Sequence, residues 1–280
     1  MRYSRPQSMD ELLRHLCSAR GDTCVLLAGG TDLMPRFEGG RPYPAELVDV
    51  KGVPDLNGLV KKKDHFEIGA LTTLEELKRS SDVRKHLTAL AEAADEFAAV
   101  QIRHRATVGG NLVNASPAGD TIPPLVALGA KLHIVGREGE RVVSIAQFTQ
   151  GPGKTVLETG EVLKSIEVPF NGGISRFVKL GLRRAMAISV VNFAVSCKVG
   201  KNGFTSLRIA AGAVAPTIVT LDEYAEAVVA DPKAIDRDID LVDRSISPID
   251  DLRASGSYRR KALKNLVKHT LHQLLEGTGE

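Results

Sequence analysis

The feature that most constrains the fold is the stretch from Gln101 to Ala130, which places a glycine pair and several short polar side chains directly before an apolar run. The pair is Gly109-Gly110, and hydrogen-bonding side chains follow it at Asn111, Asn114, Ser116, Asp120 and Thr121. The run from Ile122 to Ala130 is predicted to be helical, because its two prolines fall in the first turn, where proline is tolerated. The stretch therefore predicts a small polar loop that leads into a helix.

A loop of this kind suits an anionic ligand. Glycine has no Cβ, so the backbone can approach a ligand closely, and bare N–H groups near a helix N-terminus attract phosphates. The upstream stretch from Val25 to Pro35 repeats the pattern, since an apolar run leads to Gly29-Gly30, Thr31 and Asp32. Neither stretch matches G-x-G-x-x-G or G-x-x-x-x-G-K-[ST], and either one alone could be an ordinary tight turn. Together they predict a site for a large phosphate-bearing ligand.

Composition argues against several other classes of function. The net charge of +3 is spread along the chain, and the aromatic content is 4% without tryptophan, so nucleic-acid binding is not expected. No apolar run reaches membrane-spanning length, and the N-terminus lacks the apolar core of a signal peptide. The cysteines at 17, 24 and 197 suit neither a disulfide framework nor an iron–sulfur or zinc set. A reducing, cytoplasmic setting is therefore expected.

Hydrophobic periodicity predicts an α+β fold in two parts. In residues 1–170, helices are predicted at 10–20, 34–37, 72–80, 83–97 and 122–129, and strands at 25–28, 47–50, 59–63, 66–70, 131–135, 140–144 and 163–168. These elements form two lobes, about 1–55 and 56–170, with the ligand between them. Beyond a boundary at 171–173, residues 174–280 contain an antiparallel sheet backed by helices. Its strands are predicted at 174–180, 190–199 and 204–214, and its helices at 221–229, 233–242 and 257–275.

The sequence resembles the FAD-binding medium subunits of molybdenum hydroxylases, the carbon monoxide dehydrogenase and xanthine dehydrogenase type enzymes. Residues 28–35, AGGTDLMP, and 102–120, IRHRATVGGNLVNASPAGD, resemble the two flavin-binding stretches of that family. Four further stretches resemble it in the same order, at 68–77, 160–169, 178–195 and 251–263. The resemblance implies a two-lobed PCMH-type FAD-binding domain over 1–170, followed by a C-terminal α+β domain over 174–280.

The resemblance also implies which residues bind FAD. Gly29-Gly30 and Gly109-Gly110 match the two phosphate loops. Asp120 matches an acidic position that contacts the flavin nucleotide, with a helix N-cap as the alternative. The predicted cofactor-binding residues are Leu26, Leu27, Ala28, Gly29, Gly30, Thr31, Asp32, Leu33, Phe97, Thr107, Val108, Gly109, Gly110, Asn111, Ser116, Asp120, Leu163 and Lys179.

Several of these positions have a second interpretation. Lys179 matches a position near the flavin ring, where a cation would stabilise the reduced, anionic flavin; a surface strand lysine is the alternative. Phe97 and Leu163 match apolar positions of the flavin pocket, and plain core packing is the alternative for both. The cluster from Arg103 to Arg105 either lines the access side of the flavin or meets an acidic partner subunit, and His104 could be a plain loop residue. Histidine spacing predicts no metal site, and no nucleophile–base pair stands out.

The function that the resemblance implies is electron transfer within a molybdopterin-dependent hydroxylase or dehydrogenase. Substrate would be oxidised on a large molybdopterin subunit, electrons would pass through two [2Fe–2S] clusters of a small subunit, and FAD would pass them to NAD, a quinone or another acceptor. Relatives that reduce hydroxybenzoyl-CoA carry a cysteine-rich insertion that this chain lacks between Asn111 and Asp120, which disfavours that role. Two alternatives stay open. One is a stand-alone flavin oxidoreductase of the same fold, although no acid–base pair supports it. The other is a scaffold that has lost FAD, although the intact glycine pairs argue against it.

Overall fold

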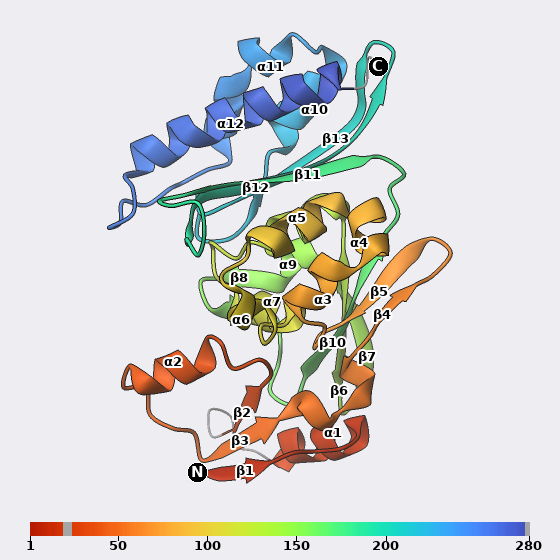
Figure 1. Cartoon of the computed structure of the whole chain (residues 1–280), viewed down its shortest axis with the longest axis vertical. Coiled ribbons are helices and arrows are strands. Elements are labelled where there is room, and N and C mark those ends of the chain that lie inside the picture. The colour runs from red at the N-terminus through yellow and green to blue at the C-terminus, as the bar shows by residue number, and fades with distance from the viewer. Residues whose placement is uncertain (19–23, 278–280) are drawn as a thin grey trace.

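A computed structural model describes residues 1–18 and 24–277, and its three tiers follow the chain from one end of an elongated molecule to the other (Figure 1). The N-terminal lobe lies at one end, a middle lobe follows, and the C-terminal sheet with its helices lies at the opposite end. The predicted α+β class and the two-lobed arrangement ahead of a C-terminal domain are confirmed.

The N-terminal lobe is a parallel sheet with the strand order β1-β3-β2. It consists of β1 (Arg2–Ser4), α1 (Met9–Ser18), β2 (Cys24–Leu27), α2 (Leu33–Glu38) and β3 (Glu46–Asp49), followed by two 3-10 turns at Val50–Gly52 and Pro54–Leu56. Strand β1 was not predicted, because three residues at a sheet edge carry too little apolar alternation to be recognised. The predicted end of the first helix, near Gly21, lies outside the described residues.

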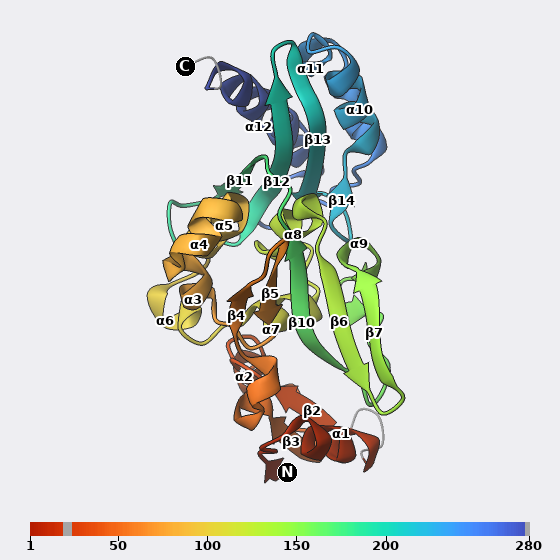
Figure 2. The ribbon, with the colours of Figure 1, turned by 90° about the vertical axis from the view of Figure 1, so that its right-hand side faces the viewer.

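The middle lobe is a five-stranded antiparallel sheet in the order β4-β5-β10-β6-β7, with helices on one face (Figure 2). Its strands are β4 (Leu59–Lys61), β5 (His65–Gly69), β6 (Lys131–Gly136), β7 (Gly139–Ser144) and β10 (Val162–Pro169). Its helices are α3 (Leu74–Arg79), α4 (Ser81–His86), α5 (Thr88–Glu96), α6 (Val100–Arg103), α7 (Val108–Asn114), α8 (Ile122–Leu128) and α9 (Ile145–Phe148). A small hairpin, β8 (Thr149–Gly151) and β9 (Lys154–Thr155), follows α9. Alternation along the strands turns side chains such as Phe66, Ile68 and Leu132 toward the helices, where they are buried.

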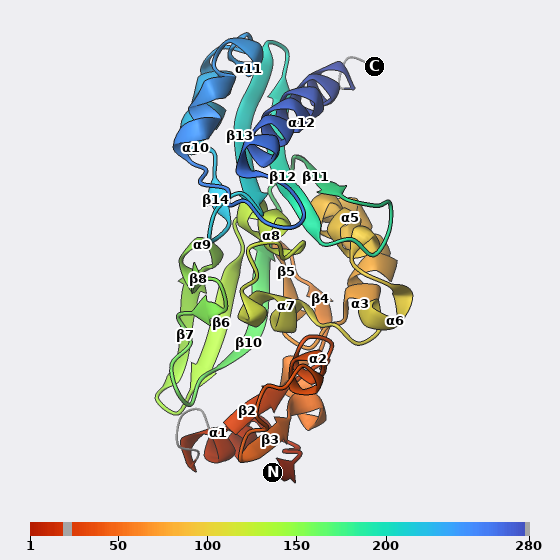
Figure 3. The same cartoon turned by 90° about the vertical axis from the view of Figure 1, so that its left-hand side faces the viewer.

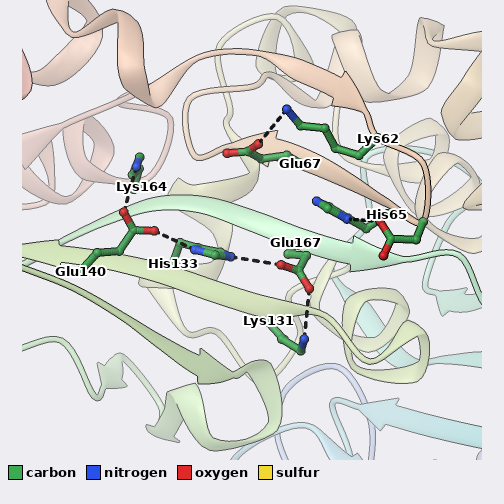
Figure 4. Close-up of polar contacts among 9 residues, drawn as sticks. Lys62, His65, Glu67, Lys131, His133, Glu140, Lys164 and Glu167 are labelled. Atoms are coloured by element: carbon green, nitrogen blue, oxygen red, sulfur yellow. Dashed lines mark hydrogen bonds and ion pairs between the residues drawn. The ribbon is translucent and has the colours of Figure 1, made fainter.

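The opposite face of this sheet carries charges of alternating sign (Figure 4). Glu167 contacts Lys131 at 3.1 Å and His133 at 3.4 Å, while Glu140 contacts His133 at 2.8 Å and Lys164 at 2.9 Å. Exposed pairs of this kind contribute at most about 1 kcal/mol each. Their main effect is to give the uncovered face a polar surface.

The C-terminal domain is an antiparallel sheet in the order β11-β12-β13-β14 that is covered on both faces. Its elements are β11 (Ile174–Gly181), β12 (Ser189–Gly200), β13 (Gly203–Gly212), β14 (Val219–Thr220), α10 (Asp222–Ala230), α11 (Ala234–Arg237), a 3-10 helix (Ile239–Arg244) and α12 (Gly256–Glu276). Helices α10 and α12 lie on the outer face, and α5 and α8 of the middle lobe lie against the inner face (Figures 1 and 3). Strand β12 is therefore buried from Ser189 to Cys197. Small side chains of Ala89, Ala93, Ala194 and Ala210 allow the two parts to pack closely.

Helix α7 differs most from the prediction, which expected a polar loop after Gly109-Gly110. The segment is helical because Thr107 caps it, with its Oγ1 accepting a hydrogen bond from the Gly110 N–H at 3.0 Å. Two glycines are tolerated in this short helix, and Ala115 ends it with φ of 47°. The predicted helix over 83–97 is also two helices, α4 and α5, separated at Leu87.

Candidate functional site

A cleft of about 430 Å³ lies between the N-terminal and middle lobes, within the size range usual for ligand sites. The N-terminal lobe lines it with the loop after β2, and the middle lobe with the start of α7, the turn after α5 and strand β10. Most of the predicted cofactor-binding residues meet here: Leu26, Ala28, Gly29, Gly30, Thr31, Asp32, Leu33, Phe97, Thr107, Gly109, Gly110, Asn111 and Leu163. Two glycine stretches that lie about 80 positions apart in the sequence therefore share one cavity.

The glycines are required where backbones approach each other. A Cβ at Gly29 would lie 1.9 Å from the carbonyl oxygen of Arg105, across the junction of the two lobes. A Cβ at Gly109 would lie 2.6 Å from both the Cβ and the carbonyl oxygen of Ala70. Gly30 has φ of +75°, which favours glycine. At Gly29 and Gly109, therefore, no larger residue fits without moving the backbone beside the cleft.

The two stretches differ in the donors that they offer. The backbone N–H groups of Gly30, Thr31 and Asp32 have no hydrogen-bond partner within the described part of the chain, so they are open to a ligand. In contrast, the N–H of Gly109 donates to the Ala70 carbonyl at 2.9 Å, and that of Gly110 donates to Thr107. The expectation of bare N–H groups at Gly109-Gly110 is therefore wrong, because α7 and its contact with Ala70 use them.

The carboxylates that line the cleft are paired with arginines. Asp32 contacts Arg36 at 2.7 Å, and Asn114 joins both by accepting from Arg36 at 2.7 Å and donating to Asp32 at 3.3 Å. Glu161 takes two hydrogen bonds from Arg141, at 2.6 and 2.7 Å, and these hold the pKa of Glu161 below its usual value. Asp32 and Glu161 therefore oppose an anionic ligand less than free carboxylates would.

A cation also lies beside the first loop. Lys51, in the 3-10 turn after β3, donates to the Ala28 carbonyl at 3.1 Å and contacts Asp49 at 2.7 Å. Sequence reasoning missed Lys51, Arg36 and Glu161, because nothing in their local sequence distinguishes them from surface charges.

Asp120 and Lys179 lie outside the lining of this cleft, yet the structure brings them together. Their side chains are 8% and 6% exposed and form an ion pair of 2.6 Å between the α7–α8 loop and β11. Ser189 and Asn192 of β12 donate to the other carboxylate oxygen at 2.6 and 2.8 Å. Asp120 is not the helix cap, since the N-cap of α8 is Thr121, and Lys179 is not a surface lysine. The alternatives considered for both residues are therefore wrong.

The remaining predicted residues do not line the cleft. Val108 is fully buried, and the hydroxyl of Ser116 accepts a hydrogen bond from the Ala118 N–H at 3.3 Å. Leu27 is partly buried in β2 and does not line the cleft. Arg103 is 7% exposed and contacts Glu75 at 3.2 Å, so the expectation that it faces the flavin access side or a partner is wrong. Its neighbours at 104 and 105 are exposed.

Within 1–18 and 24–277, no group of three or more His, Cys, Asp or Glu side chains is arranged to hold a metal ion. No helix in the same ranges has the length and apolar character that crossing a bilayer requires.

Comparison with known proteins gives matches along nearly the whole chain. Residues 1–171 match the family model described as the FAD binding domain in molybdopterin dehydrogenase, and residues 176–274 match the CO dehydrogenase flavoprotein C-terminal domain. The xanthine dehydrogenase FAD-binding subunit of Escherichia coli O157:H7 is 31% identical over 99% of this chain and 97% of its own length. The carbon monoxide dehydrogenase medium chain of Hydrogenophaga pseudoflava is 29% identical over 96% and 95%. A chain of reconstituted CO dehydrogenase from Oligotropha carboxidovorans superimposes with a TM-score of 0.93 at 27% identity, covering 99% and 98% of the two chains.

Proposed function

The chain belongs to the FAD-binding subunits of molybdopterin dehydrogenases, and from that premise we propose that it is the electron-transfer subunit of a three-part hydroxylase or dehydrogenase. In this proposal a large partner subunit oxidises the substrate at a molybdopterin cofactor, and a small partner subunit conducts electrons through two [2Fe–2S] clusters. The electrons then leave through FAD in this chain to NAD, a quinone or another acceptor.

The observation that carries the proposal is the cleft between the lobes. It combines open backbone donors at Gly30, Thr31 and Asp32 with two glycines whose Cβ positions are filled by neighbouring backbone. Pyrophosphate is bound well by several converging N–H groups, and an apolar cavity suits a flavin ring. The chemistry of these residues therefore fits FAD.

Each part of the site has a task in this proposal. The loop from Gly30 to Asp32 binds the pyrophosphate through its N–H groups, and Lys51 adds positive charge beside it. Phe97 and Leu163 provide apolar surface that excludes water. FAD supplies the conversion between single-electron transfer from the clusters and two-electron transfer to an acceptor.

The family resemblance implies that Asp120 and Lys179 act near the flavin nucleotide. In this proposal they act from outside the cleft lining, where Lys179 donates at 3.3 Å to the carbonyl oxygen of Glu96, the residue before Phe97 of the cleft wall. Their pairing fixes both charges, since Ser189 and Asn192 hold the second oxygen of the carboxylate. A fixed positive charge near a flavin stabilises its reduced form, so Lys179 would tune the electron transfer.

The test is substrate-driven reduction of the co-expressed complex, followed by its absorbance spectrum. Substrate should bleach both the iron–sulfur and the flavin bands, and an acceptor should restore them. A matched sample stripped of FAD should still show cluster reduction by substrate and should lose transfer to the acceptor. If the FAD-free complex reduces the acceptor at the normal rate, the proposed electron path is wrong.

A further inference from the structure

Arg103 connects three parts of the middle lobe that are separate in sequence. It lies at the end of α6 and is 7% exposed. Its Nε donates to Glu75 of α3 at 3.2 Å, while its Nη1 donates to the carbonyl oxygens of Phe97 and Ala98 at 3.0 and 3.2 Å. One guanidinium group therefore joins α3 to the turn that follows α5.

That turn is strained and forms part of the cleft wall. Ala98 has φ of 41°, a left-handed conformation that is unfavourable for a residue with a Cβ. Phe97 and Ala98 both line the cleft. Strained residues persist where surrounding contacts over-determine them, and they concentrate at functional sites. Arg103 supplies two hydrogen bonds to this turn, and Phe97 also packs against the core of the middle lobe.

Glu75 is the buried carboxylate that fixes the position of the Arg103 guanidinium. Its side chain is 9% exposed, and its other partner is Arg79, at 2.8 Å, whose side chain is 69% exposed. Burial alone would raise the pKa of Glu75, but hydrogen bonds from Arg103 and Arg79 outweigh it and hold the pKa below its usual value. A charged Glu75 thus faces a charged Arg103 inside the lobe.

We propose that Arg103 and Glu75 are positioning residues for the cofactor: they hold the strained Phe97–Ala98 turn in the shape that the flavin-binding cleft requires. The inference rests on the proposed binding of FAD in this cleft. It assigns Arg103 a role that needs the planar guanidinium, because a lysine ammonium lacks the fixed fork of donors that reaches two carbonyls and a carboxylate together.

The test compares four variants of the full chain in its complex. Arg103→Gln should raise the FAD dissociation constant about tenfold or more and change the visible circular dichroism of the bound flavin. Arg103→Lys should be impaired as well. Arg79→Gln removes the exposed partner of the same carboxylate and should leave both properties unchanged. Adding Ala98→Gly to Arg103→Gln should restore most of the affinity, because glycine adopts this φ without strain.

Two results would overturn the inference. One is equal FAD affinity and flavin dichroism in the Arg103 and Arg79 variants. The other is that Ala98→Gly does not restore FAD binding. In that case the loss of binding in Arg103→Gln would come from general destabilisation and not from the turn. If Arg103→Gln does not fold, the same measurements are made on Arg103→Lys, alone and combined with Ala98→Gly. The electron path is measured separately, by substrate-driven reduction. If that path is refuted but the variants still change FAD affinity as predicted, the positioning role of Arg103 is still supported.

Discussion

Gly29→Ala tests whether position 29 must be glycine because the two lobes pack closely there. The added methyl would lie 1.9 Å from the Arg105 carbonyl oxygen, 2.7 Å from its carbonyl carbon and 3.1 Å from the Ala106 Cα. All three neighbours are backbone atoms, so no side chain can rotate away. An ordinary contact begins at 3.4 Å, so the lobes would have to separate locally by about 1.5 Å, the difference between the two distances.

The size of the effect follows from that displacement. Overpacking of this kind costs about 1–3 kcal/mol. The FAD-free chain can relieve the clash by opening the cleft. Bound FAD, however, needs the backbone donors of the N-terminal lobe and the cleft wall of the middle lobe at their present separation. The cost should therefore appear in binding, and at about 1.4 kcal/mol per factor of ten it corresponds to FAD affinity that is about 5- to 150-fold weaker.

The assay is a titration that follows the change in flavin fluorescence on binding, with thermal unfolding of the FAD-free protein measured in parallel. Gly151→Ala is the matched control, because its Cβ would have no neighbour within 4 Å. It should bind FAD as the unmodified chain does. If Gly29→Ala keeps both the affinity and the unfolding temperature of the unmodified chain, the steric reasoning is refuted.

Three other predictions follow from the same structure. Gly110→Val should abolish FAD binding, because a side chain there projects into the cleft and crowds the capping hydroxyl, which lies 2.8 Å from the Cβ position; normal flavin content in a folded variant would contradict this. Asp120→Asn should lower the free energy of unfolding by about 3–5 kcal/mol in urea, since it removes the carboxylate that pairs with the buried Lys179 at 2.6 Å, and adding Lys179→Met should recover part of the loss. The hydrogen bonds and charges around Glu140 and Glu167 hold their pKa values below the usual range, so the stability that they contribute is complete above about pH 4.3 and is lost as the pH falls further. Replacing both glutamates with glutamine should flatten the dependence of the unfolding temperature on pH below about 4.3, and an unchanged profile would exclude them as its source.

The stretches that resemble the family and the hydrophobic periodicities were sufficient to predict the fold class and many of the residues that line the cleft. Both glycine pairs line one cavity between the lobes, and at Gly29 and Gly109 neighbouring backbone leaves no room for a Cβ. The error at α7 has a specific cause. Gly109-Gly110 looks like a loop by composition, but Thr107 supplies a cap and the glycines fall in the first turn, so the segment becomes helical.

The sequence by itself determined the local features of this protein: strand alternation, helix caps, and the glycines that permit close approach of backbones. These depend on neighbours within a few positions of the chain. Only the tertiary structure decided the partners of its buried charges. Arg103 meets Glu75 across 28 positions, and Asp120 meets Ser189 across 69. Such pairs form because packing of the lobes removes these groups from water, where an unpaired charge would be costly, and no local pattern encodes which partner will be within reach.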